Sequence, residues 1–203
     1  MTHSRAFYAL TATVVLFAAS TAAAQDKCSV KAVIGGQAVE MTHCAIAVMD
    51  DKGATILFSV TPISAQERSE FQMNSYAKSS DPAGKPRSMM HLMFCAASGG
   101  KSVPDAAAVK SVEMSMSHAS SLMAQRQWVF DLPRDNKEFA FRTLSGSLKP
   151  GGRFVGQATG AKTSDGLKYS WDVRFDIAVP TAEAAAGPSC GWLDLRTWAD
   201  NCC

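Results

Sequence analysis

The stretch YSWDVRFDIAV, residues 169–179, decides the fold class, because large apolar side chains occupy every second position. The residues between them include Asp172, Arg174 and Asp176. Successive side chains point to opposite faces of a β-strand, so this pattern predicts a strand with one buried and one solvated face. We interpret the three charged side chains as part of the solvated face, and not as a pair of catalytic carboxylates.

The same alternation, punctuated by glycine and proline turns, recurs along the chain from Cys28 onward. It predicts a mainly β domain of about eight or nine strands, and such a series of short strands is typical of an antiparallel β-sandwich or, as the alternative, a small β-barrel. Besides the strand over 169–179, the predicted strands cover residues 28–34, 38–49, 54–60, 88–97, 109–118, 127–132, 139–144 and 153–159.

One or two short helices are expected beside these strands. Ser64 and Glu67 have the spacing of a capping box, in which each side chain accepts a hydrogen bond from the other residue's backbone N–H. This motif predicts a short helix over residues 65–71. Pro104 favours one further helical turn over residues 104–108, because proline is well tolerated at a helix start.

The N-terminal residues have the pattern of a secretory signal. Arg5 precedes an apolar run over residues 6–19, and Ala22-Ala23-Ala24 provides small residues for cleavage. We therefore expect a signal peptide at 1–24, a β-rich domain at 25–180, and an Ala/Pro connector with a cysteine-containing tail at 181–203. The expected location is periplasmic or secreted, and no later apolar run is long enough to predict a transmembrane helix.

The charge of the chain argues against some classes of partner. There are 20 basic and 18 acidic residues, for a formal net charge of +2. A nearly neutral chain without a basic block gives no electrostatic reason to expect nucleic acid as a partner. The partner classes that remain are a protein, an envelope component or a small ligand.

Six cysteines in an exported chain predict disulfides. If residues 35–37 form a three-residue hairpin loop, Cys28 lies opposite Cys44, which predicts the first disulfide. Cys95 with Cys190 is the second expected pair and would join a central strand to the tail. Three states stay open for Cys202 and Cys203: a bond between these neighbours, pairing between chains, or free thiols.

Methionine precedes each histidine of the predicted mature chain by two residues. Thioether and imidazole ligands together suit copper, so the pattern provides a candidate metal site if the two strands that carry it converge. Core packing explains the same pattern more simply, because methionine is an adaptable core residue. The candidate ligands are Met89, His91, Met93, Met114, Met116 and His118, with Met41 and His43 as possible additions, and the expectation is no cofactor with copper as the alternative.

Other motifs carry less chemistry. The run at 156–163 resembles a phosphate loop, but Ala161 occupies the position of the second glycine, so we expect a hairpin loop. Gly146-Ser147 lies in an expected turn without the strand-to-helix context of a hydrolase nucleophile, which leaves a secreted hydrolase as an unfavoured alternative. Trp192 and Trp198 in the tail are candidate partner contacts. Trp128 and Trp171 instead occupy strand positions whose side chains are expected to face the core. The favoured hypothesis is a non-catalytic exported β-sandwich that binds a partner or ligand.

Overall fold

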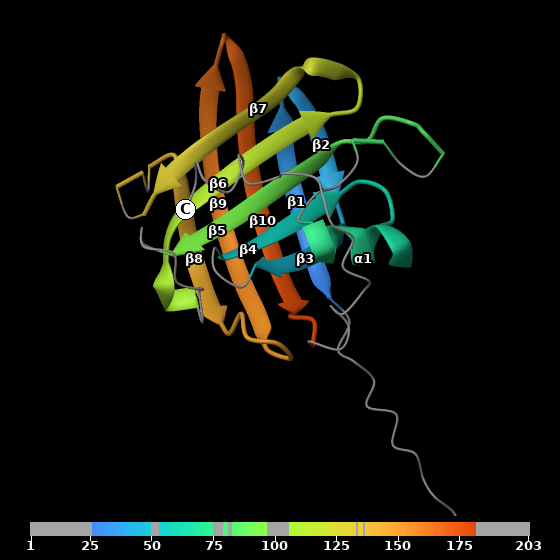
Figure 1. Ribbon diagram of the computed structural model, residues 1–203. Coiled ribbons are helices and arrows are strands. Elements are labelled where there is room, and N and C mark those ends of the chain that lie inside the picture. The colour runs from blue at the N-terminus through green and yellow to red at the C-terminus, as the bar shows by residue number, and fades with distance from the viewer. Residues whose placement is uncertain are drawn as a thin grey trace, which may run out of the picture.

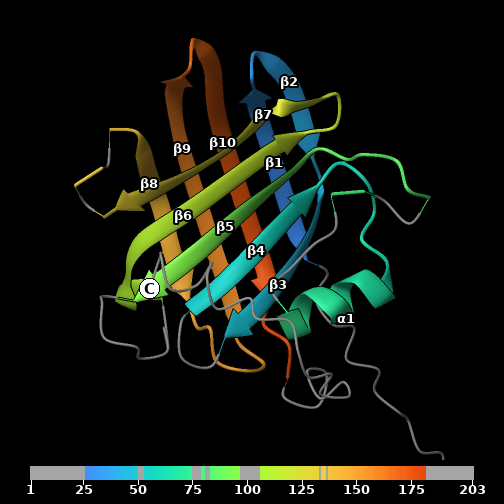
Figure 2. The ribbon, with the colours of Figure 1, turned by 45° about the horizontal axis from the view of Figure 1, so that its top comes forward.

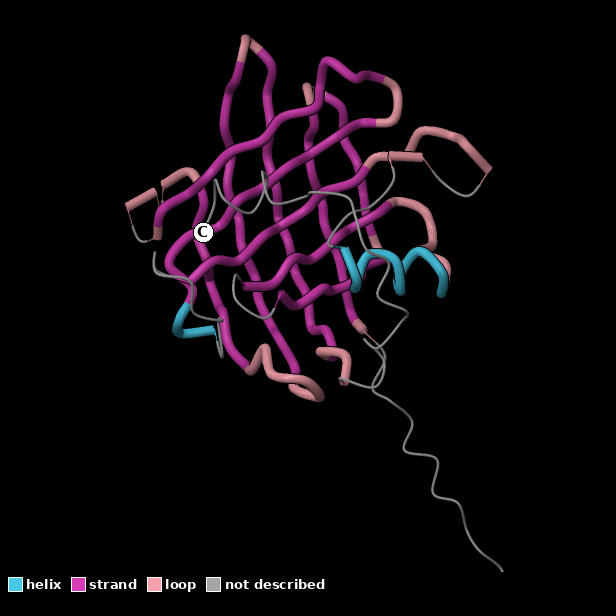
Figure 3. The backbone as a smooth tube through the Cα atoms, viewed as in Figure 1, coloured by secondary structure: helices cyan, strands magenta, loops and turns pink. Residues whose placement is uncertain are grey.

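The computed structural model describes residues 26–49, 53–74, 79–80, 83–96, 106–132, 134–135 and 137–181. The predicted signal peptide at 1–24 and the tail with Cys190, Trp192 and Trp198 lie outside these residues. Strands dominate the described chain, with one α-helix and one 3-10 turn (Figures 1 and 3). The elements are β1 (Lys27–Ile34), β2 (Gln37–Met41), β3 (His43–Met49), β4 (Gly53–Ser59), α1 (Ala65–Asn74), β5 (Met89–Ala96), η1 (Ala106–Ala108), β6 (Val109–His118), β7 (Ser121–Asp131), β8 (Phe139–Gly146), β9 (Arg153–Ser164) and β10 (Leu167–Ala178).

The strands form two antiparallel five-stranded sheets that pack face to face. Sheet A has the order β2-β1-β10-β9-β8, and sheet B has the order β3-β4-β5-β6-β7. Figures 1 and 2 show the strands of sheet B crossing those of sheet A at a steep angle. The predicted antiparallel β-sandwich is therefore confirmed. The described strands do not close into a barrel, so that alternative is wrong.

The core lies between the sheets and is rich in aromatic rings. The ring of Phe94 on β5 lies 5.0 Å from that of Phe154 and 5.8 Å from that of Phe175, both on sheet A. Trp171 is buried, and Trp128 is partly buried with its ring 4.9 Å from that of Tyr169, so both core placements are confirmed. The odd-numbered residues of 169–179 form one wall of this core, as their alternation predicts: Tyr169, Trp171, Val173, Phe175, Ile177 and Val179.

The predicted strand over 38–49 is in fact two strands in different sheets. β2 ends at Met41, and after Thr42 the chain enters β3 of sheet B. The positions that face the sandwich core change phase at this point, from Val39 and Met41 to Cys44 and Ile46, while Ala45 and Ala47 are buried on the other face of β3. A chain that turns from one inner face to the other must shift its apolar phase by one residue. The sequence does not reveal this shift, because every residue from Cys44 to Met49 is apolar.

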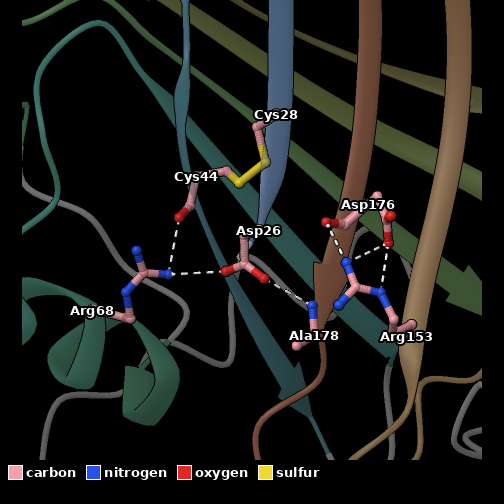
Figure 4. Close-up of a disulfide and its surroundings, with 7 residues drawn as sticks. All are labelled: Asp26, Cys28, Cys44, Arg68, Arg153, Asp176 and Ala178. Carbon is pink, nitrogen blue, oxygen red and sulfur yellow. Dashed lines mark hydrogen bonds and ion pairs between the residues drawn. A yellow bond between two sulfur atoms is a disulfide. The ribbon is translucent and has the colours of Figure 1, made fainter. Parts of the chain in front are cut away.

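The predicted Cys28–Cys44 disulfide is present, but it joins the sheets and does not cross a hairpin (Figure 4). The hairpin turn is the two-residue Gly35-Gly36, where both φ angles are positive, so Ile34 pairs with Gln37. Two-residue turns of this kind match the twist of the flanking strands. The predicted three-residue loop is therefore wrong, and the cysteines meet because β1 and β3 lie across the core with Cα atoms 6.1 Å apart.

Polar contacts surround this disulfide at the same end of the sandwich (Figure 4). The Arg68 side chain of α1 donates a hydrogen bond to the Cys44 carbonyl at 2.9 Å. Arg68 also lies 3.6 Å from Asp26, and Asp26 accepts a hydrogen bond from the Ala178 backbone N–H at 2.9 Å. The two sheets and the helix are thus held together by one covalent bond and a short chain of polar contacts.

The expected hairpin loop over 156–163 is also wrong, because these residues belong to β9 and the turn lies at Asp165-Gly166. The glycines of this stretch make room for rings on β10. A Cβ atom on Gly156 would lie 2.3 Å from the Phe175 ring, and one on Gly160 would lie 2.6 Å from the Trp171 ring. Glycine within a strand often marks such a close approach.

Candidate functional site on the outer side of sheet B

The central strands of sheet B carry a row of polar and sulfur-containing side chains on the side turned away from sheet A. β5 and β6 pair antiparallel, and residues directly opposite each other share a face. Three pairs point away from the core: Met89 with Ser117, His91 with Ser115, and Met93 with Glu113. We call these six residues the β5–β6 outer face.

The structure divides the predicted copper ligands between the two faces of sheet B. Met114 and Met116 lie in the sandwich core, opposite Leu92 and Met90. Met89, His91 and Met93 point the other way. The two strands are neighbours as expected. Their register, however, places the methionines of β6 on the inner face and Met89, His91 and Met93 on the outer face.

The remaining histidines also stay apart from this face. His118 ends β6, and its Nδ1 accepts a hydrogen bond from the Ser120 backbone N–H at 3.1 Å. Met41 is buried in the sandwich core, and His43 is the first residue of β3. The structure therefore brings together three of the predicted ligands, Met89, His91 and Met93, on one face of one strand.

Helix α1 covers one side of the β5–β6 outer face. Its predicted capping box is present: the Glu67 N–H donates to the Ser64 hydroxyl at 3.1 Å, and the Ser64 N–H donates to the Glu67 carboxylate at 2.9 Å. The helix extends to Asn74 and not to Phe71 as predicted. Phe71 is fully buried in a second apolar cluster that includes Leu57 and Met89.

His91 lies beneath this helix, with its ring stacked on that of Phe71 at a centroid distance of 6.2 Å and an angle of 12°. Nδ1 lies 3.2 Å from the Ser115 hydroxyl oxygen. Nε2 is buried, with no hydrogen-bond partner in the part of the chain that the structure describes. Burial first, and the nearby Arg87 guanidinium second, lower the pKa of His91 to about 4. The imidazole is therefore neutral at neutral pH.

Glu113 adds an ionisable group to the same face. The residue is 3% exposed, and burial raises the pKa of its carboxyl. Oε1 accepts a hydrogen bond from the Gln127 side-chain amide, whereas Oε2 is buried and has no partner within the described ranges. Thr55 on the neighbouring strand β4 pairs with Met93, and its buried hydroxyl also has no partner within the described ranges. Buried polar atoms without partners are rare. Of the seven such side-chain atoms among the described residues, four lie on or beside this face and three lie on β10, so we take this face as the candidate site.

Cys95 follows Met93 on the same face of β5. It is fully buried and disulfide-bonded. Its predicted partner, Cys190, lies outside the described residues. A cysteine in a disulfide offers no thiolate, so Cys95 is not available as a metal ligand in this state.

Ser115 and His91 have the composition of a nucleophile and a base, but a histidine pKa of about 4 makes a weak base at neutral pH.

An open depression of about 480 Å³ lies on the other sheet, where Val33, Lys162, Thr163 and Lys168 line it. Within the described residues, no group of three or more His, Cys, Asp or Glu side chains is placed to hold a metal ion.

Sequence reasoning identified Met89, His91 and Met93 but missed Glu113, Thr55 and the role of Ser115. The alternation Glu113, Ser115, Ser117 is visible in the sequence, yet a polar phase ordinarily indicates a solvated face.

Comparisons with protein-family models, curated proteins and solved structures found no match to this chain. Of the helices described, none has the length and apolar character needed to cross a membrane.

Proposed function

We propose that this chain is an exported, non-catalytic binding module whose binding site is the β5–β6 outer face. The observation that carries the proposal is the set of buried polar atoms without hydrogen-bond partners on that face: His91 Nε2, Glu113 Oε2 and Ser117 Oγ, with Thr55 Oγ1 beside them. Burying a polar group without a partner costs free energy. A ligand that supplies the missing partners would recover that cost on binding.

A small ligand fits these observations better than a broad protein or envelope surface. Surfaces that dock large partners commonly expose contiguous apolar patches. Among the described residues, the only large exposed hydrophobic side chains are Met73 at 41% and Val129 at 48%, one on α1 and one on β7. The β5–β6 outer face instead offers an imidazole, a carboxyl, hydroxyls and two thioethers within a small area.

Two features support the export part of the proposal. The sequence pattern of residues 1–24 is that of a cleavable signal, and the Cys28–Cys44 disulfide is suited to an oxidising compartment. The expected result is an exported protein whose N-terminus is Gln25, measured by intact mass after expression with its own leader. A protein retained in the cytoplasm with its leader uncleaved would contradict export.

The binding site can be located by NMR of protein labelled with ¹³C in the methionine methyl groups. The probe is a library of small-molecule fragments, because binding sites attract fragments of diverse chemistry. We expect hits to shift the methyl signals of Met89 and Met93, with those of Met90, Met114 and Met116 unaffected as core controls. The proposal fails if no fragment shifts Met89 or Met93, or if the hits shift only the core methyls.

A further inference from the structure

The strongest chemically specific feature of the β5–β6 outer face is the arrangement of three donors along β5. Met89, His91 and Met93 are two residues apart from one another, so their side chains project from the same face of the strand. Both methionines are at most 9% exposed. The imidazole therefore lies between two shielded thioethers, which is a different set from the one that the sequence alone suggested.

The hydrogen bond of His91 orients the ring for a ligand. With the hydrogen on Nδ1, the ring donates to the Ser115 hydroxyl, and Nε2 keeps its lone pair. Histidines that bind metals commonly donate their other ring N–H to a neighbouring group, which fixes the tautomer and the ring orientation. Ser115 provides that group here, and the stacked ring of Phe71 restricts the imidazole plane. Nε2 is the buried atom that lacks a partner among the described residues.

The nearby charges are compatible with a monovalent cation. The buried Arg87 is paired with Glu67 at 2.9 Å, so this cation has an adjacent carboxylate. Glu113 lies directly opposite Met93, and its Oε2 has no partner within the described chain. Two thioethers and one imidazole form a soft donor set, which selects Cu(I) among the biological metals.

We propose that Met89, His91 and Met93 bind one Cu(I) ion on the β5–β6 outer face, through two thioether sulfurs and Nε2. Ser115 is a positioning residue, and the carboxyl of Glu113 lies opposite Met93 on β6. This proposal depends on the proposed function for the location of the site and adds the ligand. Met114 and Met116 take no part, because the ladder places them in the sandwich core.

The test is anaerobic competition for Cu(I) between the full-length mature protein and a chromophoric Cu(I) chelator. Ascorbate keeps the copper reduced and leaves the disulfides intact. We expect one equivalent of Cu(I), bound with submicromolar affinity. His91→Ala and Met93→Leu are expected to weaken binding at least tenfold.

Met90→Leu and Met116→Leu are the matched controls, because these two methionines lie opposite each other on the inner side of the same two strands. Leucine nearly conserves the volume of methionine, so all three methionine variants are expected to fold. The controls should retain the native affinity within twofold. X-ray absorption of the native complex gives a second measurement, with sulfur and nitrogen scatterers expected around copper.

The metal proposal is overturned by binding that is micromolar or weaker, or by an equal loss in the core controls. It is also overturned by a copper environment that contains no sulfur. Failure of this test together with fragment-induced shifts at Met89 and Met93 would reject the metal and leave the binding face standing. Failure of both experiments would reject the site itself.

Discussion

The Nδ1 atom of His91 lies 3.2 Å from the hydroxyl oxygen of Ser115, the residue directly opposite it on β6. Ser117 follows on the same face of β6, but its buried hydroxyl has no partner in the described part of the chain. The two serines share a strand, a face and a functional group. They differ in whether a hydrogen bond satisfies them, and this difference can be measured.

Ser115→Ala is expected to lower the free energy of unfolding by about 1–2 kcal/mol, because it leaves a buried ring nitrogen without its partner. Ser117→Ala should leave stability unchanged or raise it slightly, because it removes a hydroxyl that is buried without a partner. Urea unfolding of both variants and the native protein provides the measurement. Equal losses for the two variants would contradict the assignment of the hydrogen bond.

The lowered pKa of His91 predicts a loss of stability in mild acid. The folded protein keeps the imidazole neutral down to about pH 4, whereas the unfolded chain takes up the proton near pH 6.5. The unfolded state therefore binds more protons in this window, and the free energy of unfolding falls as pH drops from 6.5 to 4, by up to about 3 kcal/mol. Urea midpoints of metal-free protein measure this slope. His91→Gln should flatten it, and an unchanged slope would contradict the prediction.

Glu113 predicts the opposite slope, because burial raises the pKa of its carboxyl above 4.5. The folded state holds this proton at pH values where the unfolded chain has lost it, so stability falls as pH rises through the folded pKa. Glu113→Gln removes this term and keeps the shape of the side chain. The variant should therefore gain stability relative to the native protein as the pH rises above 4.5. A stability difference that is constant with pH would refute the prediction.

The elements with the strongest apolar alternation are the ones that the sequence predicts correctly. Residues 169–179 form a core strand because all six side chains at alternate positions are apolar, and any other phase would expose them. The capping box of Ser64 and Glu67 was equally predictable, because its hydrogen bonds are local. These features depend on short-range geometry that the sequence itself contains.

The functional face depends on a relationship that is not local. Whether His91 and Met116 share a face is decided by the parity of the β5–β6 register, and a shift of one residue would reverse it. The sequence of the segment that connects these strands does not reveal which register they adopt. Glu113 was missed for a related reason, since the outer side of a sandwich sheet is ordinarily solvated and nothing local predicts its burial.

The disulfide between Cys28 and Cys44 predicts a large stability difference, because it fixes β1 of one sheet to β3 of the other. The cysteines are separated by 16 residues, and closing a loop of this size is worth about 3 kcal/mol. The double variant Cys28→Ser/Cys44→Ser should lose about that amount in urea unfolding. This variant is preferable to chemical reduction, since Cys95 is also disulfide-bonded. A loss below about 1 kcal/mol would show that the polar contacts of Arg68 and Asp26 hold this end without the disulfide.

Gly156 predicts a steric effect within the core. A Cβ atom at this position would lie 2.3 Å from Cζ of Phe175, and that ring is enclosed by Phe94 and Phe154, with centroids at 5.8 Å and 5.2 Å. Gly156→Ala should therefore lower the free energy of unfolding by about 1–3 kcal/mol, although alanine is otherwise acceptable in a strand. Phe175→Leu makes room for the methyl group, so the double variant should lose less than the sum of the two single losses. Urea unfolding of all four proteins forms a double-mutant cycle, and additive losses would show that the ring of Phe175 is not what requires glycine.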